Sequence, residues 1–264
     1  MPKAISSRDN PLIKRLKALA GSASHRRALG QTVLDGPHLV TAALDGAWPL
    51  LEVVVAESAL GRPEVAGILQ RLRDVPAYCL PDGLFAQASP VDSPAGILAV
   101  IALPQPPVLR RLEGSAVVLD RVQDAGNLGT ILRTAVAAGV RQALLTPGCA
   151  QAWSPKVLRA GMGAHFGLVL VEQAEVAGLV EGYPGQILAT ALAPDAQDLF
   201  ALDLAGPTVW LFGSEGQGLS PQLAALATRR VAIPMAAGVE SLNVAAAAAV
   251  CLFEQFRQRR GAGS

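Results

Sequence analysis

Hydrophobic and polar residues alternate along the chain in two blocks, each of which mixes short apolar runs with longer amphipathic ones. In the first block, Leu12, Leu16 and Leu19 recur at helical spacing with lysine and arginine between them, which predicts an amphipathic helix with a basic face. Short strand-like runs then alternate with helical runs, a pattern typical of a small α/β sandwich. The expected strands are 32–35, 51–56 and 96–103, and the expected helices are 37–46 and 63–74.

The second block follows Pro104 to Ser115, a proline-rich and charged stretch that predicts a linker between separately folded units. Continuous apolar strands are separated there by helical runs such as 128–139, which predicts a parallel sheet covered on both faces. A final helix is expected from Leu242 to Arg259. The expected strands are 115–120, 143–147, 166–171, 186–190, 208–213 and 229–234.

Composition excludes several classes of protein. With 51% hydrophobic and 16% charged residues, the chain is too apolar for a disordered protein. Cys79, Cys149 and Cys251 are widely spaced, so they indicate free thiols in a reducing compartment instead of a disulfide framework or a metal site. The first residues lack the apolar core of a signal peptide, and the longest apolar run, Val244 to Phe253, is too short to span a bilayer. We therefore expect a cytoplasmic protein with no membrane partner.

Positive charge is concentrated at the start of the chain. Residues 1–30 hold seven lysines and arginines and one acid, a charge of +6, while the remaining 15 basic and 20 acidic residues give −5. Such clustering is the footprint of a protein that binds a polyanion such as nucleic acid, although an ordinary solvated helix face would give the same pattern. The candidate RNA-binding residues are Lys14, Arg15, Lys17, Arg26 and Arg27.

Three polar loops that contain glycine each follow an expected strand, at Asp120 to Gly129, Gly213 to Ser220 and Pro234 to Asn243. Ligands of open α/β sheets bind where such strand ends meet. Glycine allows the backbone of these loops to approach a ligand closely. We therefore expect the three loops to form one ligand site.

Other kinds of site fit the sequence poorly. The glycines of GSEGQG stand at 213, 216 and 218, which is not the GxGxxG spacing, and they come late in the domain, so a nicotinamide-dependent oxidoreductase is disfavoured. No GxxxxGK[ST] motif of a P-loop NTPase occurs. His25, His38 and His165 show no ligand spacing, so no metal is expected.

Taken in order, the three loops resemble the motifs of the SpoU (TrmH) family of RNA 2′-O-ribose methyltransferases, which belongs to the SPOUT class. The first motif is present as GNLGTILRTA with Asn127 and Arg133, and the second as FGSEGQGLS with Glu215. The third is present as IPMAAGVESLNVAAA with Ser241 and Asn243. The chain departs from the family pattern at two positions, with Ala125 where proline is common and Ala245 where serine is common.

The N-terminal block is similar to the ribosomal-protein-like substrate-binding domain of family members that modify ribosomal RNA. The resemblance therefore implies an α/β protein with an N-terminal RNA-binding domain at 1–103, a linker at 104–115 and a trefoil-knotted, parallel-sheet methyltransferase domain at 116–264. It also implies a homodimer formed through the C-terminal domain, and methyl transfer from S-adenosylmethionine to a ribose 2′-hydroxyl of 23S ribosomal RNA. A tRNA ribose methyltransferase and a catalytically silent RNA-binding assembly factor are the alternatives. A catalytically silent protein would have no reason to retain all five motif residues, which are Asn127, Arg133, Glu215, Ser241 and Asn243.

The resemblance assigns roles to the motif residues, and each role has a structural alternative. Arg133 is the candidate for activating the 2′-hydroxyl, either as an unusual base or, as we favour, by holding a neighbouring phosphate and assisting deprotonation. Helical periodicity alone would make it a solvated arginine. Asn127 stands where a helix N-cap is expected. Glu215 would hold Arg133 or the RNA site, or would be an ordinary turn carboxylate.

The third motif supplies two polar side chains where a helix cap needs only one, and this surplus indicates a functional loop. Ser241 and Asn243 would fix the loop and the reacting groups. The resemblance implies that the cofactor is bound by the loop backbone, and the expected cofactor-binding residues are Gly213, Ser214, Ile233, Met235 and Leu242.

Overall fold

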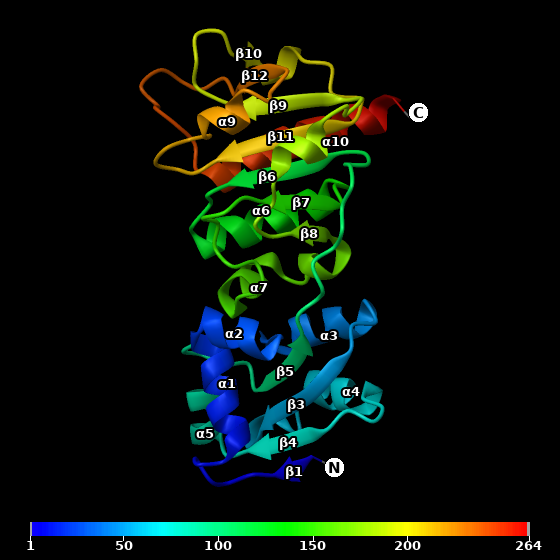
Figure 1. Ribbon diagram of the computed structural model, residues 1–264. Coiled ribbons are helices and arrows are strands. Elements are labelled where there is room, and N and C mark those ends of the chain that lie inside the picture. The colour runs from blue at the N-terminus through cyan, green and yellow to red at the C-terminus, as the bar shows by residue number, and fades with distance from the viewer. Residues whose placement is uncertain (1, 263–264) are drawn as a thin grey trace. The chain divides into compact units, whose positions relative to one another are not determined.

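The chain forms two compact α/β units (Figure 1). The computed structural model describes residues 2–262, with the side chain of Ala262 excepted. The N-terminal unit holds the residues up to Gln105 together with Trp153–Phe166, and the C-terminal unit holds Pro106–Ala152 and the residues from Gly167 onward. The chain backbone therefore passes between the two units three times.

The N-terminal unit is built on a five-stranded sheet with the order β1-β4-β3-β5-β2. β4 pairs in parallel with β1 and β3, whereas β5 runs antiparallel to β3 and β2. Its strands are β1 (Lys3–Ala4), β2 (Gln31–Asp35), β3 (Leu50–Ala56), β4 (Ala77–Leu80) and β5 (Ile97–Ala102), and its helices are α1 (Pro11–Gly21), α2 (Ala23–Leu29), α3 (Pro37–Asp45), α4 (Pro63–Arg71), α5 (Asp82–Ala88) and α7 (Pro155–Gly161).

The basic-faced helix expected near the start of the chain is confirmed as α1. Pro11 occupies its first turn, and the Asn10 side chain caps it by accepting a hydrogen bond of 2.9 Å from the Leu12 nitrogen. Leu16 and Leu19 are fully buried on its apolar face. Burial of each such leucine contributes roughly 1.5–3 kcal/mol, so α1 is part of the folded core and also carries part of the positive charge.

Residues 153–166 pack against the N-terminal unit, although the sequence pattern groups them with the second block. The ring centroids of Trp153 and Trp48 lie 5.3 Å apart, and those of Phe166 and Trp48 lie 5.2 Å apart. The Thr32 hydroxyl donates a buried hydrogen bond of 2.7 Å to the Trp153 carbonyl. These contacts hold α7 against β2, and no local sequence pattern predicts them.

The C-terminal unit is built on a seven-stranded sheet with the order β10-β12-β9-β11-β6-β7-β8, and all of its neighbouring strands are parallel. The predicted parallel sheet is therefore confirmed. Its strands are β6 (Ala116–Asp120), β7 (Gln142–Leu145), β8 (Val169–Val171), β9 (Gln186–Thr190), β10 (Gln197–Asp198), β11 (Thr208–Gly213) and β12 (Arg229–Ala232), and its helices are α6 (Ala125–Ala137), α8 (Val176–Val180), α9 (Pro221–Ala224) and α10 (Val244–Ala262).

β6 and β11 are far apart in the sequence and lie side by side in the sheet (Figure 1). Their parallel register pairs Gly213 with Asp120, the last residues of the two strands. The loops that follow these strands therefore begin at the same edge of the sheet.

Some elements were not expected. The short strands β1, β4 and β10 and the short helices α2, α5, α7, α8 and α9 carry too little periodicity to be recognised. The strand expected at 166–171 is shorter, because residues Ala164–Gly167 form a 3-10 turn. α10 begins at Val244 and not at Leu242. Among the described residues, no helix has the length and apolar character needed to cross a bilayer.

α10 packs on α6 and β11 through small side chains and one buried amide. Gln255 is 2% exposed, and its oxygen accepts a hydrogen bond of 2.8 Å from the Trp210 indole nitrogen of β11. Its amide nitrogen donates to the Ser115 hydroxyl at 3.1 Å and to the Gly206 carbonyl at 3.0 Å. Gln255 therefore satisfies two buried polar groups, on Trp210 and Ser115, and also binds the carbonyl of Gly206 just before β11.

We predict that Gln255→Ala destabilises the C-terminal unit by roughly 1–3 kcal/mol, because the Trp210 nitrogen would remain buried without a partner. Urea unfolding and amide hydrogen exchange of β11 and α10 measure the effect. The matched control is Gln70→Ala on the exposed side of α4, which should leave both measurements unchanged. Equal stability of the two variants would contradict the prediction.

Candidate functional site

A cavity of about 430 Å³ lies in the C-terminal unit, at the carboxyl ends of three neighbouring parallel strands. Thr190 ends β9, Gly213 ends β11 and Ala232 ends β12, and all three line the cavity. The segment that precedes α10 forms another wall with Ser241 and Leu242. This is the edge of an open α/β sheet where ligands bind.

Gly213 is required by the tight fold of the loop that follows β11. A Cβ atom at this position would overlap the backbone of Gly218 and Leu219. The Gly218 nitrogen donates to the Ser214 carbonyl at 2.9 Å, which closes the loop on itself. Gly218 has a φ of +64°, a conformation that favours glycine. Two of the glycines of the GSEGQG motif therefore shape the loop, which presents Glu215 at the cavity.

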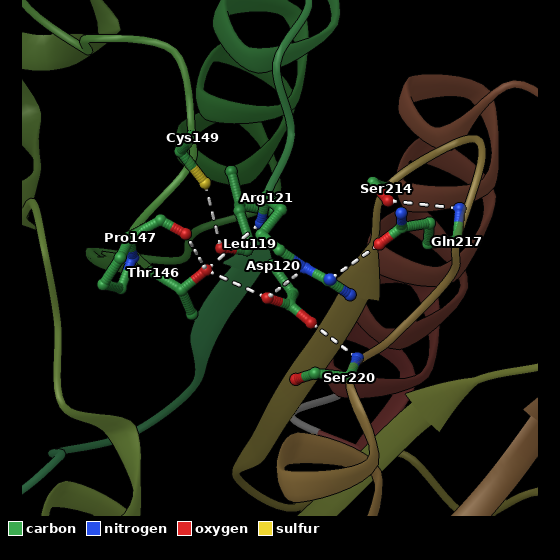
Figure 2. Close-up of polar contacts among 9 residues, drawn as sticks. All are labelled: Leu119, Asp120, Arg121, Thr146, Pro147, Cys149, Ser214, Gln217 and Ser220. Atoms are coloured by element: carbon green, nitrogen blue, oxygen red, sulfur yellow. Dashed lines mark hydrogen bonds and ion pairs between the residues drawn. The ribbon is translucent and has the colours of Figure 1, made fainter.

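The end of this loop is anchored by the carboxylate of Asp120, as Figure 2 shows. Asp120 is 3% exposed and accepts a hydrogen bond of 2.6 Å from the Ser220 nitrogen. Its other oxygen accepts from the Thr146 hydroxyl at 3.0 Å, and the Arg121 Nε lies 3.3 Å from the same oxygen. One carboxylate thus joins β6, the segment after β7 and the loop after β11.

Several opposing effects act on the pKa of Asp120. Burial by itself would raise the pKa of this carboxyl, but the hydrogen bonds from Ser220 and Thr146 and the charge of Arg121 outweigh it. The pKa therefore lies below its usual value, and the group is a carboxylate at neutral pH. Sequence reasoning did not single out Asp120, although an acidic residue at the end of an apolar strand was a usable signal.

Arg121 extends the same network to the middle of the loop. Its Nη1 donates a hydrogen bond of 2.8 Å to the Gln217 side chain (Figure 2). Arg121 has a φ of +55°, which is uncommon for a residue with a side chain. Asp120 therefore holds the end of the loop 213–220 through Ser220, and Arg121 holds its middle through Gln217.

The three loops expected to form one site are joined by a chain of side-chain hydrogen bonds. The Asn243 amide donates to the Asn127 side-chain oxygen at 3.0 Å. The Asn127 amide in turn donates to the carboxylate of Glu215. One residue of each motif thus belongs to a single row of contacts, and both Glu215 and Asn243 line the cavity.

Two expectations about these residues need correction. The N-cap of α6 is Asp124, whose carboxylate accepts from the Asn127 nitrogen at 2.7 Å, so Asn127 lies inside the first turn and its side chain is available for the other motifs. Glu215 pairs with Asn127 and not with Arg133. Within residues 2–262, the exposed Arg133 side chain forms no hydrogen bond or ion pair, and it does not line the cavity.

Asn243 has a structural role as well as a place in the site. Its side-chain oxygen accepts from the Ala245 nitrogen at 2.9 Å and from the Ala246 nitrogen at 3.2 Å, which caps α10. Its amide nitrogen takes no part in the cap and donates to the Asn127 side chain. Ser241 is exposed and lines the cavity, as Asn243 does.

All five residues expected to bind a cofactor line the cavity. Sequence reasoning missed the wall contributed by β9, where Thr190 and Leu192 line the same space. The segment after β9 lacks the glycine-bearing polar loop used to find the others, so only the strand order brings it there. The five expected residues are Gly213, Ser214, Ile233, Met235 and Leu242.

The candidate RNA-binding residues lie in α1 and α2 of the N-terminal unit and have different surroundings. Lys14 and Lys17 are exposed, with Lys14 lying 3.5 Å from Asp9, and Arg27 is exposed as well. Arg15 is half-buried. Arg26 is 5% exposed and donates to the Leu19 carbonyl at 2.7 Å.

Arg26 therefore differs from the expectation of a phosphate contact, because its guanidinium binds the carboxyl end of α1. The four remaining basic residues keep the exposed or half-buried positions that the prediction needs. Among the described residues, no group of three or more histidine, cysteine or acidic side chains is placed to hold a metal ion.

Comparison with known proteins identifies both parts of the chain. A family model described as the SpoU rRNA Methylase family matches residues 114–253. A second model, described as the MRM3-like substrate binding domain, matches residues 10–99. The two matches fall on the two blocks that the sequence pattern separates.

Relatives of similar length cover nearly the whole chain. An uncharacterized tRNA/rRNA methyltransferase of Synechocystis is 37% identical over 99% of this chain and 96% of its own. The 23S rRNA (uridine(2479)-2′-O)-methyltransferase of Streptomyces viridochromogenes is 30% identical over 97% of this chain and 93% of its own.

A solved structure agrees in fold as well. The SpoU methyltransferase AviRb from Streptomyces viridochromogenes, crystallised with the cofactor AdoMet, superposes with a TM-score of 0.86 at 27% identity over 95% of this chain and 98% of that one. The family model, the full-length relatives and the shared fold lead to one conclusion: the chain belongs to the SpoU rRNA methylase family.

Proposed function

We propose that the protein transfers a methyl group from S-adenosylmethionine to a ribose 2′-hydroxyl of 23S ribosomal RNA. The observation that carries the proposal is the row of contacts from Asn243 through Asn127 to Glu215, which joins the three family motifs beside one cavity. Membership of the SpoU family and the activities named for the relatives support it.

The residues around the cavity fit S-adenosylmethionine. The volume of about 430 Å³ lies in the range of roughly 300–1,000 Å³ common for small-molecule sites. Leu192, Ile233 and Leu242 offer apolar surface for an adenine ring, and Ser214 and Thr190 offer polar groups. When bound, the cofactor supplies an activated methyl group on a positively charged sulfur. The carboxylate of Glu215 lines the same cavity and complements that charge.

Within this proposal the chain's own residues align the substrate and ease the loss of the 2′-hydroxyl proton. Arg133 projects from the same helix as Asn127 and, in the described residues, has no protein partner, so its guanidinium is available to a phosphate of the RNA. A guanidinium donates hydrogen bonds and has no acceptor, so it stabilises the charge that develops on the 2′-oxygen, and the proton itself leaves to water.

The N-terminal unit favours ribosomal RNA over tRNA as the substrate. Its match to a substrate-binding domain covers residues 10–99, and its first 30 residues carry a charge of +6. We accordingly propose the division into an RNA-binding domain at 1–103, a linker at 104–115 and a methyltransferase domain at 116–264, with the exception that residues 153–166 pack with the N-terminal unit. Residues 104–115 contain no helix or strand.

We also propose a trefoil knot, a homodimer formed through the C-terminal domain and a cytoplasmic location. The strand order supports the knot, because β11 lies between β6 and β9, and β12 lies between β9 and β10. For the dimer, α10 carries the exposed apolar side chain of Phe253, which is 46% exposed. The small residues of α10 would allow close packing of a second chain.

The central test is to map 2′-O-methyl groups across total RNA from cells with and without the protein. We expect loss of at least one methylated ribose in 23S ribosomal RNA. Loss of a methyl group at a tRNA position alone would identify tRNA as the substrate. An unchanged methylation map would refute the proposed activity.

We predict that Arg133→Ala lowers kcat by about 100-fold or more, the usual effect of removing one preorganised group that stabilises developing charge. Affinity for S-adenosylmethionine, measured by calorimetry, should change little, because Arg133 does not line the cavity. Arg133→Lys keeps the positive charge but loses the bidentate geometry of the guanidinium. Its activity should therefore lie between that of the wild type and that of Arg133→Ala. Normal turnover of Arg133→Ala would remove this residue from the mechanism.

Asp120 generates a separate prediction, since it anchors the loop that lines the cofactor cavity. We expect Asp120→Asn to weaken binding of S-adenosylmethionine by about tenfold and to lower the free energy of unfolding at pH 7, because a charged acceptor for the Ser220 nitrogen is lost. The pKa of Asp120 is lowered in the folded state, so its stabilisation is present above the ordinary pKa of about 4 and is lost as pH falls through the folded value.

The stability gap between wild type and Asp120→Asn should therefore narrow as the pH is lowered below about 4. Unfolding measured across pH tests this dependence. Asp92→Asn, at an exposed carboxylate in the N-terminal unit, is the matched control. A gap that stays constant across pH would show that the Asp120 charge does not stabilise the fold.

A further inference from the structure

A second cavity, of about 620 Å³, lies in the N-terminal unit and is larger than the cavity beside the three motifs. It is lined by parts of the sheet and by α1 and α2. Its walls mix charged, aromatic and apolar side chains, and those that bear on its chemistry are Lys3, Arg15, His25, Leu29, Glu52 and Tyr78.

Three of these side chains come from neighbouring strands and share one face of the sheet. Lys3 of β1 pairs in register with Tyr78 of β4, and Tyr78 pairs in register with Val54 of β3. Partners in a parallel register point to the same face, and residues two apart on a strand do so as well. Glu52 therefore lies on the same face as Tyr78 and Lys3.

Glu52 is a charged residue in an otherwise apolar strand. It is 7% exposed, and the register of the pairing between β3 and β5 shifts between Leu50 and Glu52. Such irregularities in strand pairing are often found beside functional sites. Burial of a carboxylate costs free energy unless the group is paired, so Glu52 needs a partner at this wall of the cavity.

The carboxylate of Glu52 pairs with the guanidinium of Arg15 from α1. The Nε of Arg15 is buried and has no hydrogen-bond partner within residues 2–262. The cavity therefore holds a carboxylate whose remaining lone pairs can accept a hydrogen bond from a ligand. A flat ligand with a hydrogen-bond donor on its edge would match this group.

The remaining lining residues suit a ligand that has an aromatic ring and, close to the ring, a negatively charged group. Tyr78 is half-buried, and Leu29 is 46% exposed, so both present apolar surface to an incoming ring. Lys3 and His25 are exposed and lie among the lining residues, where Lys3 can bind a phosphate. Unpaired RNA bases are bound in this way, with the ring on an aromatic side chain and the edge hydrogen-bonded.

We propose that this cavity binds one unpaired base of the RNA substrate, with its ring on Tyr78, its amino or imino edge donating to Glu52 and its phosphate near Lys3. The inference rests on the proposed function, since it takes RNA as the substrate. It assigns to the N-terminal unit the recognition of a single-stranded feature. A free anion is disfavoured by the Glu52 carboxylate, and a base inside a duplex has its edge already paired.

The test measures binding of fluorescently labelled six-nucleotide RNA strands, and of the corresponding RNA duplexes, to the full-length protein. Tyr78→Ala should weaken binding of the single strands by about 5- to 100-fold, which corresponds to stacking energies of about 1–3 kcal/mol. Tyr78→Phe keeps the ring and should restore most of the affinity. Arg71→Ala on α4, where the arginine is exposed and paired with Asp45 outside the cavity, is the matched control.

A second variant does not depend on the packing around Tyr78. Lys3→Ala removes an exposed charge and should reduce the slope of log affinity against log salt concentration by about 0.7, the value for one phosphate contact with a single strand. With ribosomal RNA as the substrate, Tyr78→Ala should raise KM for RNA while leaving the affinity for S-adenosylmethionine unchanged.

Unchanged single-strand binding by Tyr78→Ala would overturn the proposal, as would a loss in Tyr78→Phe as large as that in Tyr78→Ala. Wild-type protein that methylates ribosomal RNA while Tyr78→Ala shows an unchanged KM for RNA would refute the cavity and leave the proposed activity intact. Wild-type protein that methylates no RNA would refute the activity, and the oligonucleotide measurements would still decide the role of the cavity.

Discussion

The parallel register of β6 and β11 is the constraint on which the site depends. It places Asp120 beside Gly213 at one edge of the sheet, so a buried carboxylate can reach the Ser220 nitrogen at the end of the following loop. With the loop anchored there and closed at Ser214 and Gly218, Glu215 is held at the cavity, where it accepts a hydrogen bond from Asn127. The local chemistry of the motifs is thus a consequence of strand pairing.

Polar groups in this protein are used where segments distant in sequence must be held together. Asp120 joins three segments of the C-terminal unit, and Gln255 joins α10 to β11 and to the residues before β6. Buried polar groups are costly when unpaired, so each satisfied network favours a single arrangement of its segments. In the N-terminal unit, Arg26 has the same role at the end of α1.

The proposed division of labour separates chemistry from recognition. The cavity beside the three motifs is suited to the methyl donor, and the basic first 30 residues of the N-terminal unit are suited to RNA, with a second cavity for an unpaired base. Residues 153–166 connect these functions in an unexpected way, because they belong to the N-terminal unit while the chain on both sides of them belongs to the other. Backbone connections at three points, instead of one linker, therefore join the two units to which RNA binding and donor binding are proposed.

The sequence by itself determined the long strands, the α1 helix and the three motif loops, because apolar periodicity and glycine-bearing turns are local signals. The five residues expected to bind the cofactor all line the cavity, whereas the wall formed by Thr190 and Leu192 was missed. Only the tertiary structure decided that Asp124 and not Asn127 caps α6, that Glu215 binds Asn127 and not Arg133, and that Arg26 is buried. These facts depend on which segments meet in space, and local periodicity predicts neither the strand order nor the pairing of side chains that are distant in sequence.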